Sequence, residues 1–270
     1  MSIIASIVLY KHTLEDLNKT LYSLLYSPHI KRVILVDNDS SNWAENYAIS
    51  EPKIIYMKSE GNFGFGYGHN LAINKYACIC DYFLICNPDV YFEQIEFNNF
   101  IDFVKKRSEG LFIPKITYKN GENQFGARLI PSALDLFARR FSPKIAKRLD
   151  RKYLLSNVNI IDPVSMPYLS GCFMLFDSEA LLDLNGFDER FFMYMEDVDL
   201  SRRCASKFGT IYYPNACIVH IHEKGSHKNH KLFKAHLKST IQYFNKWGWF
   251  LDFDRTRINK KTLQQFKNKM

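Results

Sequence analysis

Short apolar runs alternate with segments of helical spacing through the first hundred residues, and this alternation limits the fold more than any other feature. An apolar run at 3–10 is followed by leucines at helical spacing behind Thr13, a residue type that commonly caps helices. Further strand-like runs lie at 32–39, 53–58 and 82–86. Short strands that alternate with helices predict an α/β fold with a mostly parallel, Rossmann-like sheet and helices on both faces.

Polar clusters follow two strands of this predicted sheet. Residues 37–39 read Asp-Asn-Asp and residues 87–89 read Asn-Pro-Asp. Such residues also start turns, so either cluster could be structural. The carboxyl ends of parallel strands share one edge, where ligands bind in open α/β sheets. Asp89 is therefore a candidate ligand for Mn²⁺ or Mg²⁺, which are held by one or two carboxylates together with phosphate oxygens and water.

A second acidic cluster lies in the other half of the chain. An aromatic stretch leads into Glu196, Asp197 and Asp199, and two arginines follow. Acids in a first helical turn suit the helix dipole and need no further role. A carboxylate that begins a helix beside aromatic rings is also partly desolvated, which raises its pKa toward that of a general base. Asp197 is the candidate for that base.

The glycine-rich loop at 61–68 offers an alternative function. It follows a strand and opens a helix, as in dinucleotide-binding folds, and Asp89 lies downstream of it. The glycine spacing does not match G-x-G-x-x-G, and a dinucleotide-binding unit normally starts with the first strand. A nicotinamide oxidoreductase is therefore the weaker interpretation.

Basic residues are concentrated near the carboxyl terminus. Residues 220–270 hold 12 Lys and Arg against 3 acids, although the whole chain has 36 against 28. Within 230–250, Phe233, Leu237, Ile241 and Phe244 share one helical face, with lysines elsewhere. Either this face packs on the domain, or it lies on an anionic membrane surface. A nucleic-acid-binding protein would explain the basic tail but not the acidic clusters, so we expect no nucleic-acid partner.

The location of the protein follows from what the sequence lacks. The first residues carry no basic segment ahead of an apolar run, and no apolar run reaches the roughly 18 residues of a membrane span. The six cysteines include no CxxC pair. We expect a cytoplasmic protein that could sit peripherally on the inner face of the cell membrane.

Seven motifs in order resemble the inverting glycosyltransferases of family 2, and among them the bacterial rhamnosyltransferase branch. The similarity extends over about residues 3–250. It implies a GT-A fold in residues 1–225, with a nucleotide-binding half to about 115, a fused acceptor-binding half at 116–225, and a basic, partly amphipathic helical segment at 226–270. The motifs are IVLY, VDNDS, GNFGFGYGHN, NPDV, LSGCFMLFDSEAL, GFDERFFMYMEDVDLSRR and YYPNACIVHIHEKGSHK.

The resemblance also implies how the donor is bound. Tyr10, Asp37 and Asp39 would hold the nucleoside. The loop of residues 62–70 would lie along the sugar and phosphates, and Asn87 replaces the first acid of the metal motif that ends in Asp89. The loop positions expected to contact the donor are Asn62, Gly64, Phe65 and Asn70.

A histidine is expected to complete the metal site. His220 and His222 flank one residue of a terminal strand, so they point to the same face, and the choice between them stays open. Asp197 would take the proton from an acceptor hydroxyl that attacks the sugar. Glu196 and Asp199 would orient that base or bind acceptor hydroxyls.

The implied reaction transfers a sugar with inversion from a nucleotide-sugar to a hydroxyl of a saccharide acceptor. The best match is rhamnose from dTDP-rhamnose, passed to a lipid-linked saccharide during the synthesis of a bacterial surface polysaccharide such as O-antigen or capsule. A UDP-sugar donor is the alternative.

Overall fold

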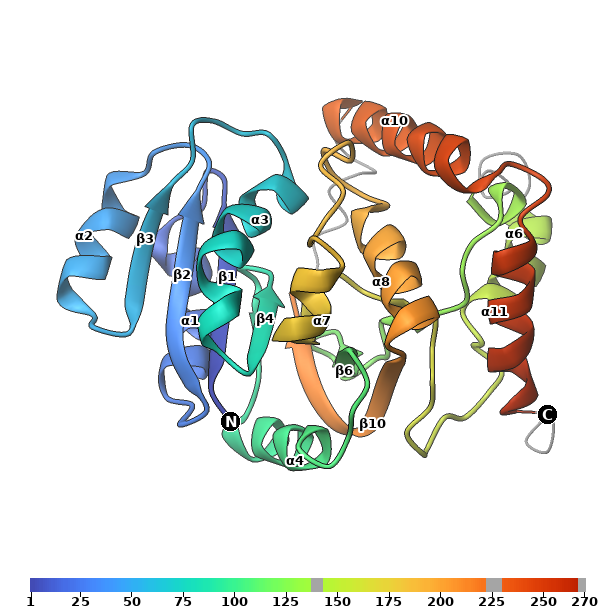
Figure 1. The fold of residues 1–270 in the computed structure, drawn as a ribbon, viewed down its shortest axis with the longest axis horizontal. Coiled ribbons are helices and arrows are strands. Elements are labelled where there is room, and N and C mark those ends of the chain that lie inside the picture. Colours follow the sequence, from blue (N-terminus) through green and yellow to red (C-terminus); the bar gives the residue numbers. More distant parts are fainter. Residues whose placement is uncertain (137–142, 222–229, 267–270) are drawn as a thin grey trace.

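One eight-stranded sheet runs through the computed structural model, which describes residues 1–136, 143–221 and 230–266 (Figure 1). The strand order is β3-β2-β1-β4-β9-β6-β10-β5. A separate pair, β7 (Ala127–Arg128) and β8 (Tyr168–Leu169), is antiparallel. The strands of the large sheet are β1 (Ile3–Leu9), β2 (Ile30–Asp37), β3 (Ile54–Lys58), β4 (Tyr82–Cys86), β5 (Val90–Tyr91), β6 (Leu111–Thr117), β9 (Phe173–Asp177) and β10 (Thr210–His220).

The first half forms the predicted parallel unit. β1 pairs in parallel with β2 and β4, and β2 pairs in parallel with β3. The chain runs outward from β1 to β3 through α1 (Leu14–Leu25) and α2 (Asn42–Ser50), then returns through α3 (Phe65–Tyr76) to β4. Both connections are right-handed, but the chain moves along the sheet in one direction through α1 and in the opposite direction through α3. The two helices therefore lie on opposite faces of the sheet.

Local sequence explains where these elements begin. Thr13 caps α1 in a capping box: its side chain accepts from the Asp16 backbone N–H, and Asp16 accepts from the Thr13 N–H. β1 is apolar along almost its whole length and buried on both faces, as expected for a central parallel strand. The predicted strands and helices of the first hundred residues are therefore confirmed.

The second half extends the same sheet with antiparallel strands. β9 inserts between β4 and β6 and is antiparallel to both, while β10 is parallel to β6 and antiparallel to β5. β9 is buried because it is flanked on both sides. The helices are α4 (Gln94–Val104), α6 (Pro143–Tyr153), α7 (Ser178–Asp183), α8 (Glu196–Lys207), α10 (His230–Trp247) and α11 (Phe253–Gln264), with a short 3₁₀ turn at Ala77–Ile79.

The amphipathic helix predicted near the carboxyl terminus is α10, and most of its apolar stripe is not buried on the domain. Phe244 is 1% exposed, whereas Phe233, Leu237 and Ile241 are 37–40% exposed. The helix instead buries Ser239, Thr240, Tyr243 and Phe244. Within the described residues, no helix combines the length and apolar character needed to cross a bilayer.

Candidate active site

The sheet brings the two polar clusters of the first half to one edge. Asp37 ends β2 beside Leu9, the last residue of β1, and the Asn38 N–H donates to the Leu9 carbonyl at 3.0 Å. β4, on the other side of β1, leads into residues 87–89. The strands are parallel, so the predicted meeting of these clusters at one edge is confirmed.

Asp37 is buried and fully hydrogen-bonded within the protein. Its carboxylate accepts from the Ser41 N–H at 2.6 Å, the Ser41 hydroxyl at 2.8 Å, the Tyr56 hydroxyl at 3.1 Å and the Asp39 N–H at 3.1 Å. Burial alone would raise the pKa of Asp37, but the hydrogen bonds from Asp39 and Ser41 outweigh it and lower the pKa. Asp37 therefore shapes the turn after β2.

Asp39 and Tyr10 lie beside Asp37 and are exposed. The Asp39 carboxylate accepts from the Lys11 N–H at 2.9 Å, and the Tyr10 ring is 45% exposed. Burial and the nearby Asp37 carboxylate raise the pKa of Asp39. Asp39 and Tyr10 are the members of the predicted nucleoside site that a ligand can reach, and their role in binding stays a prediction.

The glycine-rich loop is fitted against the second half of the chain. Gly64 has a φ of 114°, and a Cβ there would overlap the Phe192 carbonyl oxygen. The Phe65 N–H donates to that same carbonyl at 2.9 Å. Asn62 accepts from the Gly64 N–H at 3.3 Å, which shapes the turn. Only glycine fits at position 64, because both the backbone conformation and the space exclude a side chain.

Asn70 joins the same two segments. Its amide nitrogen donates to the Phe187 carbonyl and to Glu189 Oε1, each at 2.9 Å, and its oxygen accepts from the Phe187 N–H at 2.9 Å. Asn70 is 5% exposed. Its side chain holds the loop of residues 62–70 against the start of the second acidic motif.

Asp89 and His220 form a pair at the open end of β4. His220 Nε2 lies 3.3 Å from Asp89 Oδ1, and the two side chains are 9% and 34% exposed. The antiparallel pairing of β5 with β10 sets this position, since His220 lies opposite Val90. Asn87 Nδ2 lies 3.4 Å from the same histidine nitrogen. Burial opposes the charged form of His220, but Cys172 and Asp89 raise its pKa to about 10.

These two side chains fit a divalent cation. Gln124 Oε1 lies 3.0 Å from His220 Nδ1, so a proton on Nδ1 leaves the Nε2 lone pair directed toward Asp89. A bound cation would displace the proton that His220 otherwise carries. Residues 1–136, 143–221 and 230–266 contain no group of three or more His, Cys, Asp or Glu side chains placed so that they could hold a metal ion together. Two protein ligands suit a cation whose other ligands are diphosphate oxygens and water. His222, the alternative ligand, lies outside the described residues.

The second acidic cluster begins at a strained point of the backbone. Tyr194 and Met195, immediately before α8, have φ values of 68° and 70°. Each such non-glycine residue costs roughly 1–3 kcal/mol, so the surrounding packing must hold it in place. This backbone conformation leads directly into Glu196 and Asp197, which lie in the first turn of α8.

Three neighbouring carboxylates of this cluster have three different environments. Asp197 is partly exposed and accepts from the Tyr168 hydroxyl, the Gly171 N–H and the Val198 N–H at 2.9–3.0 Å. Glu196 is 5% exposed, and burial, followed by the charge of Asp197, raises its pKa to about 8. The raised pKa favours the protonated form of Glu196, and Asp197 stays the candidate base.

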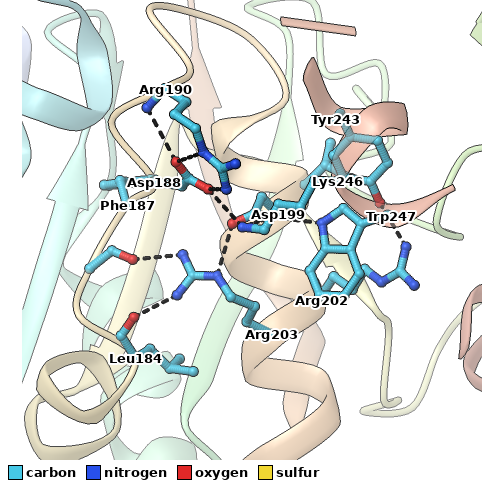
Figure 2. A network of polar contacts seen from close by, with 12 residues as sticks. Leu184, Phe187, Asp188, Arg190, Asp199, Arg202, Arg203, Tyr243, Lys246 and Trp247 are labelled. Carbon is cyan, nitrogen blue, oxygen red and sulfur yellow. Dashed lines mark hydrogen bonds and ion pairs between the residues drawn. The ribbon is translucent and has the colours of Figure 1, made fainter. Parts of the chain in front are cut away.

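Asp199 belongs to a buried ionic network (Figure 2). It is fully buried, and it pairs with Arg203 at 2.8 Å and Lys246 at 2.7 Å. The Trp247 indole N–H donates to it at 2.8 Å. Arg203 also donates to the Leu184 carbonyl, as Figure 2 shows, and to the Gly186 carbonyl. Asp199 therefore fixes α8 against α10, and any contact of Asp199 with an acceptor stays a prediction.

Arg202 makes a second buried pair between the same parts of the chain. Its guanidinium is 1% exposed and donates to the two Asp252 carboxylate oxygens at 2.7 and 2.6 Å. The centroid of the Trp247 ring lies 3.9 Å from the Cζ atom of the Arg202 guanidinium. The two arginines that follow the acidic motif therefore both pair with buried carboxylates.

A short segment ahead of β9 joins the metal-site candidates to the base candidate. The Asn87 N–H donates to the Cys172 carbonyl at 2.8 Å, and the Gly171 N–H donates to Asp197 at 3.0 Å. Sequence reasoning missed Tyr168, Gly171 and Gln124 as parts of the site. The first two lie in a Tyr-Leu-Ser-Gly stretch before an apolar strand, and a polar turn at a strand end was the available signal.

Comparisons with known proteins agree with this geometry. Residues 6–184 match the family described as glycosyl transferase family 2. The chain is 27% identical over 247 residues to the rhamnosyltransferase WbbL of Escherichia coli strain K12, covering 88% of this chain and 91% of that protein. It is 29% identical over 250 residues to the N-acetylglucosaminyl-diphospho-decaprenol L-rhamnosyltransferase of Mycobacterium tuberculosis, covering 81% of this chain and 76% of that protein.

Solved structures share the fold at lower identity. GalNAc-T7, solved with UDP, GalNAc and Mn²⁺, superposes with a TM-score of 0.68 at 13% identity, over 91% of this chain and 48% of its own. Residues 1–349 of Staphylococcus aureus TarS, solved with UDP-GlcNAc, superpose with a TM-score of 0.60 at 12% identity, over 99% of this chain and 73% of that one. The predicted GT-A fold is confirmed. The chain is a glycosyltransferase that belongs to glycosyl transferase family 2.

Proposed function

We propose that this protein transfers rhamnose from dTDP-rhamnose, with inversion, to a hydroxyl of a lipid-linked saccharide during the synthesis of a bacterial surface polysaccharide. Two relatives of similar length are rhamnosyltransferases, and the name of one specifies a decaprenol-linked acceptor. The observation that carries the proposal is the segment before β9, through which Asn87 and Asp197 are connected by Cys172 and Gly171.

The donor end of the site is formed by the edge that holds Asp39, Tyr10 and Asp89. The last of these, with His220, would hold Mn²⁺ or Mg²⁺ against the diphosphate, and Asn87 lies beside both. When bound there, such a cation would supply the positive charge that stabilises a departing nucleoside diphosphate. Tyr10 is exposed enough to lie against the base of the nucleotide.

The acceptor end of the site is formed at the start of α8. Asp197 accepts the proton of the acceptor hydroxyl as that oxygen attacks the anomeric carbon from the face opposite the diphosphate, and one displacement inverts the configuration. Tyr168 and the Gly171 N–H hold the carboxylate in position. The protonated Glu196 beside it leaves a single charge at this point of the site.

Release of nucleoside diphosphate from a panel of nucleotide-sugars tests the proposal. We expect dTDP-rhamnose to be turned over only when Mn²⁺ or Mg²⁺ is present, and the rate to increase when a polyprenyl-diphosphate-linked saccharide is added. Turnover that persists in EDTA would contradict the metal assignment. No turnover of dTDP-rhamnose alongside turnover of another donor would contradict the sugar assignment alone.

A UDP-sugar donor is the second candidate. The solved structures with the same fold include complexes with UDP and UDP-GlcNAc. The same panel separates the two donors, because the chemistry at Asp89 and Asp197 would be the same for either.

A further inference from the structure

The turn between α10 and α11 exposes three large apolar side chains within four residues. Phe250 is 86% exposed, Leu251 79% and Phe253 80%. Among the large apolar residues that the structure describes, only Ile49 is exposed to a similar degree, at 82%, and it stands alone on α2. Single exposed apolar residues are common on protein surfaces, but a contiguous group indicates an interaction surface.

The exposed side chains are held outward by the residue between them. Asp252 is 6% exposed and points inward to the buried Arg202 guanidinium, and it also caps α11 by accepting from the Arg255 N–H at 2.8 Å. Because the Asp252 side chain points inward, the side chains of its neighbours Leu251 and Phe253 point outward. This turn is therefore a fixed structure and not a loose end of the chain.

The outward side of α10 also exposes apolar side chains. Leu237 and Ile241 are each 40% exposed and lie one helical turn apart. Lys234 and Lys238 are exposed beside this stripe. On the inward side, the Ser239 hydroxyl donates to the Met193 carbonyl at 2.9 Å. Figure 1 shows α10 along one margin of the molecule, with the turn into α11 at its end.

We propose that Phe250, Leu251 and Phe253 insert into the surface of an anionic lipid bilayer, with the basic residues of α10 and α11 against the lipid headgroups. Residues 230–266 contain eight Lys and Arg against two Asp. Both acids are paired with arginines, Asp252 with Arg202 and Asp254 with Arg257. Lys246 is also paired, with Asp188 and Asp199. Apolar side chains on a segment with an excess of positive charge suit an anionic membrane.

The charge distribution selects lipid over a second copy of the chain. Two copies that met through this surface in a symmetric dimer would bring the same lysines together, and like charges repel. A bilayer that contains anionic lipid provides both an apolar interior and the opposite charge.

The purpose of this contact rests on the proposed function, whereas the contact itself does not. A lipid-linked acceptor presents its saccharide at the membrane surface. Asp252, between the inserting residues, is ion-paired to Arg202 of α8, and the same helix begins with Glu196 and Asp197. The turn would therefore fix the height and orientation of the base relative to the membrane.

Vesicle sedimentation with purified protein tests the proposal, using phosphatidylcholine vesicles with and without phosphatidylglycerol. The main variant replaces Phe250, Leu251 and Phe253 together by Ser, and the matched control is Ile49→Ser. We expect the parent and the control to bind vesicles that contain phosphatidylglycerol and the triple variant to bind at least about tenfold more weakly. Lys234→Glu with Lys238→Glu should weaken binding as well, and added salt should weaken binding of the parent.

A second measurement covers the case in which the triple variant does not fold. Phe250→Trp should add fluorescence that brominated lipids quench, whereas Ile49→Trp should add fluorescence that they do not quench. Equal binding by the parent and a folded triple variant, no binding by the parent, or equal quenching at both positions would overturn the proposal. A parent that dimerises without binding vesicles, together with a monomeric triple variant, would assign the surface to a second copy. These readings need no transferase activity, so they stand apart from the test of the proposed function.

Discussion

The two acidic regions of the site differ in how many hydrogen-bond and ion-pair partners the protein itself supplies to their carboxylates. At the end of β4, Asp89 has His220 beside it and is one-third exposed. At the start of α8, Asp197 has three hydrogen-bond donors and Asp199 has three partners, all from the chain itself. The first region is left for a ligand to complete, and the second is preorganised. Removing a side chain should therefore impair ligand binding in the first region and turnover or folding in the second.

The largest effect is expected for Asp197→Asn. A general base typically contributes about 10²- to 10⁴-fold in rate, so turnover should fall by a factor in that range, while donor affinity, which depends on the other region, stays near the parental value. Steady-state kinetics together with donor binding measure both. Glu196→Gln is the control. If turnover survives in Asp197→Asn and is lost in Glu196→Gln, the base is Glu196.

Asp252→Ala should cause the next largest loss, in stability. It leaves the buried Arg202 guanidinium without its carboxylate, and breaking a buried pair in this way costs about 3–5 kcal/mol. For a chain of this size the melting temperature should fall by roughly 10 °C. Asp254→Ala, which removes an exposed pair with Arg257 in the same helix, should change it little. Similar shifts for the two variants would mean that the buried pair does not hold α11 in place.

A smaller, local effect on turnover is expected for Gly171→Ala. An added Cβ would lie 2.9 Å from the Asp197 Cβ, which is too close, so the base must move. Misplacement of a catalytic group by about 1 Å can cost about 10²-fold, and partial relaxation should leave a loss of about tenfold in kcat. In Gly61→Ala the added methyl meets Phe63 at an ordinary 3.4 Å, so it serves as the matched control. Unchanged kcat in Gly171→Ala would separate this turn from the base.

The last effect concerns the pH dependence of stability through Glu196. Its pKa is raised to about 8 in the folded protein, so the native state binds a proton that the unfolded chain has already lost. Because the buried carboxyl resists ionisation, the free energy of unfolding of the parent decreases progressively as the pH rises from about 4.5 to 8. Glu196→Gln carries no such proton, so its melting temperature relative to the parent should rise across that pH range. A difference that stays flat with pH would show that Glu196 is ionised in the fold.

The difference between the two regions also explains what the sequence could predict. Strand ends are local features, so the meeting of Asp37 and Asp89 at one sheet edge followed from periodicity and from parallel pairing. The motif resemblance identified the family and pointed to Asp197 as the candidate base. The Asp199 and Arg202 networks depend on α10 and α11, whose position is set by long-range packing that no local pattern reports.

The buried side of α10 was also beyond sequence reasoning. The apolar stripe left a packed face and a membrane-facing one both open, and in the structure Leu237 and Ile241 are exposed whereas Ser239 and Thr240 are buried. Ser239 lies inward because it satisfies a backbone carbonyl of the segment before α8, and sequence periodicity carries no information about that partner.

Nucleotide binding measured in two variants tests the division of labour between the two regions most directly. Calorimetric titration of dTDP would be carried out with Mn²⁺ and with EDTA, on the parent, Asp89→Ala and Asp197→Asn. The account predicts Mn²⁺-dependent binding by the parent and by Asp197→Asn, and loss of that dependence in Asp89→Ala with the fold intact. Parental Mn²⁺-dependent affinity in Asp89→Ala, or its loss in Asp197→Asn, would contradict the account.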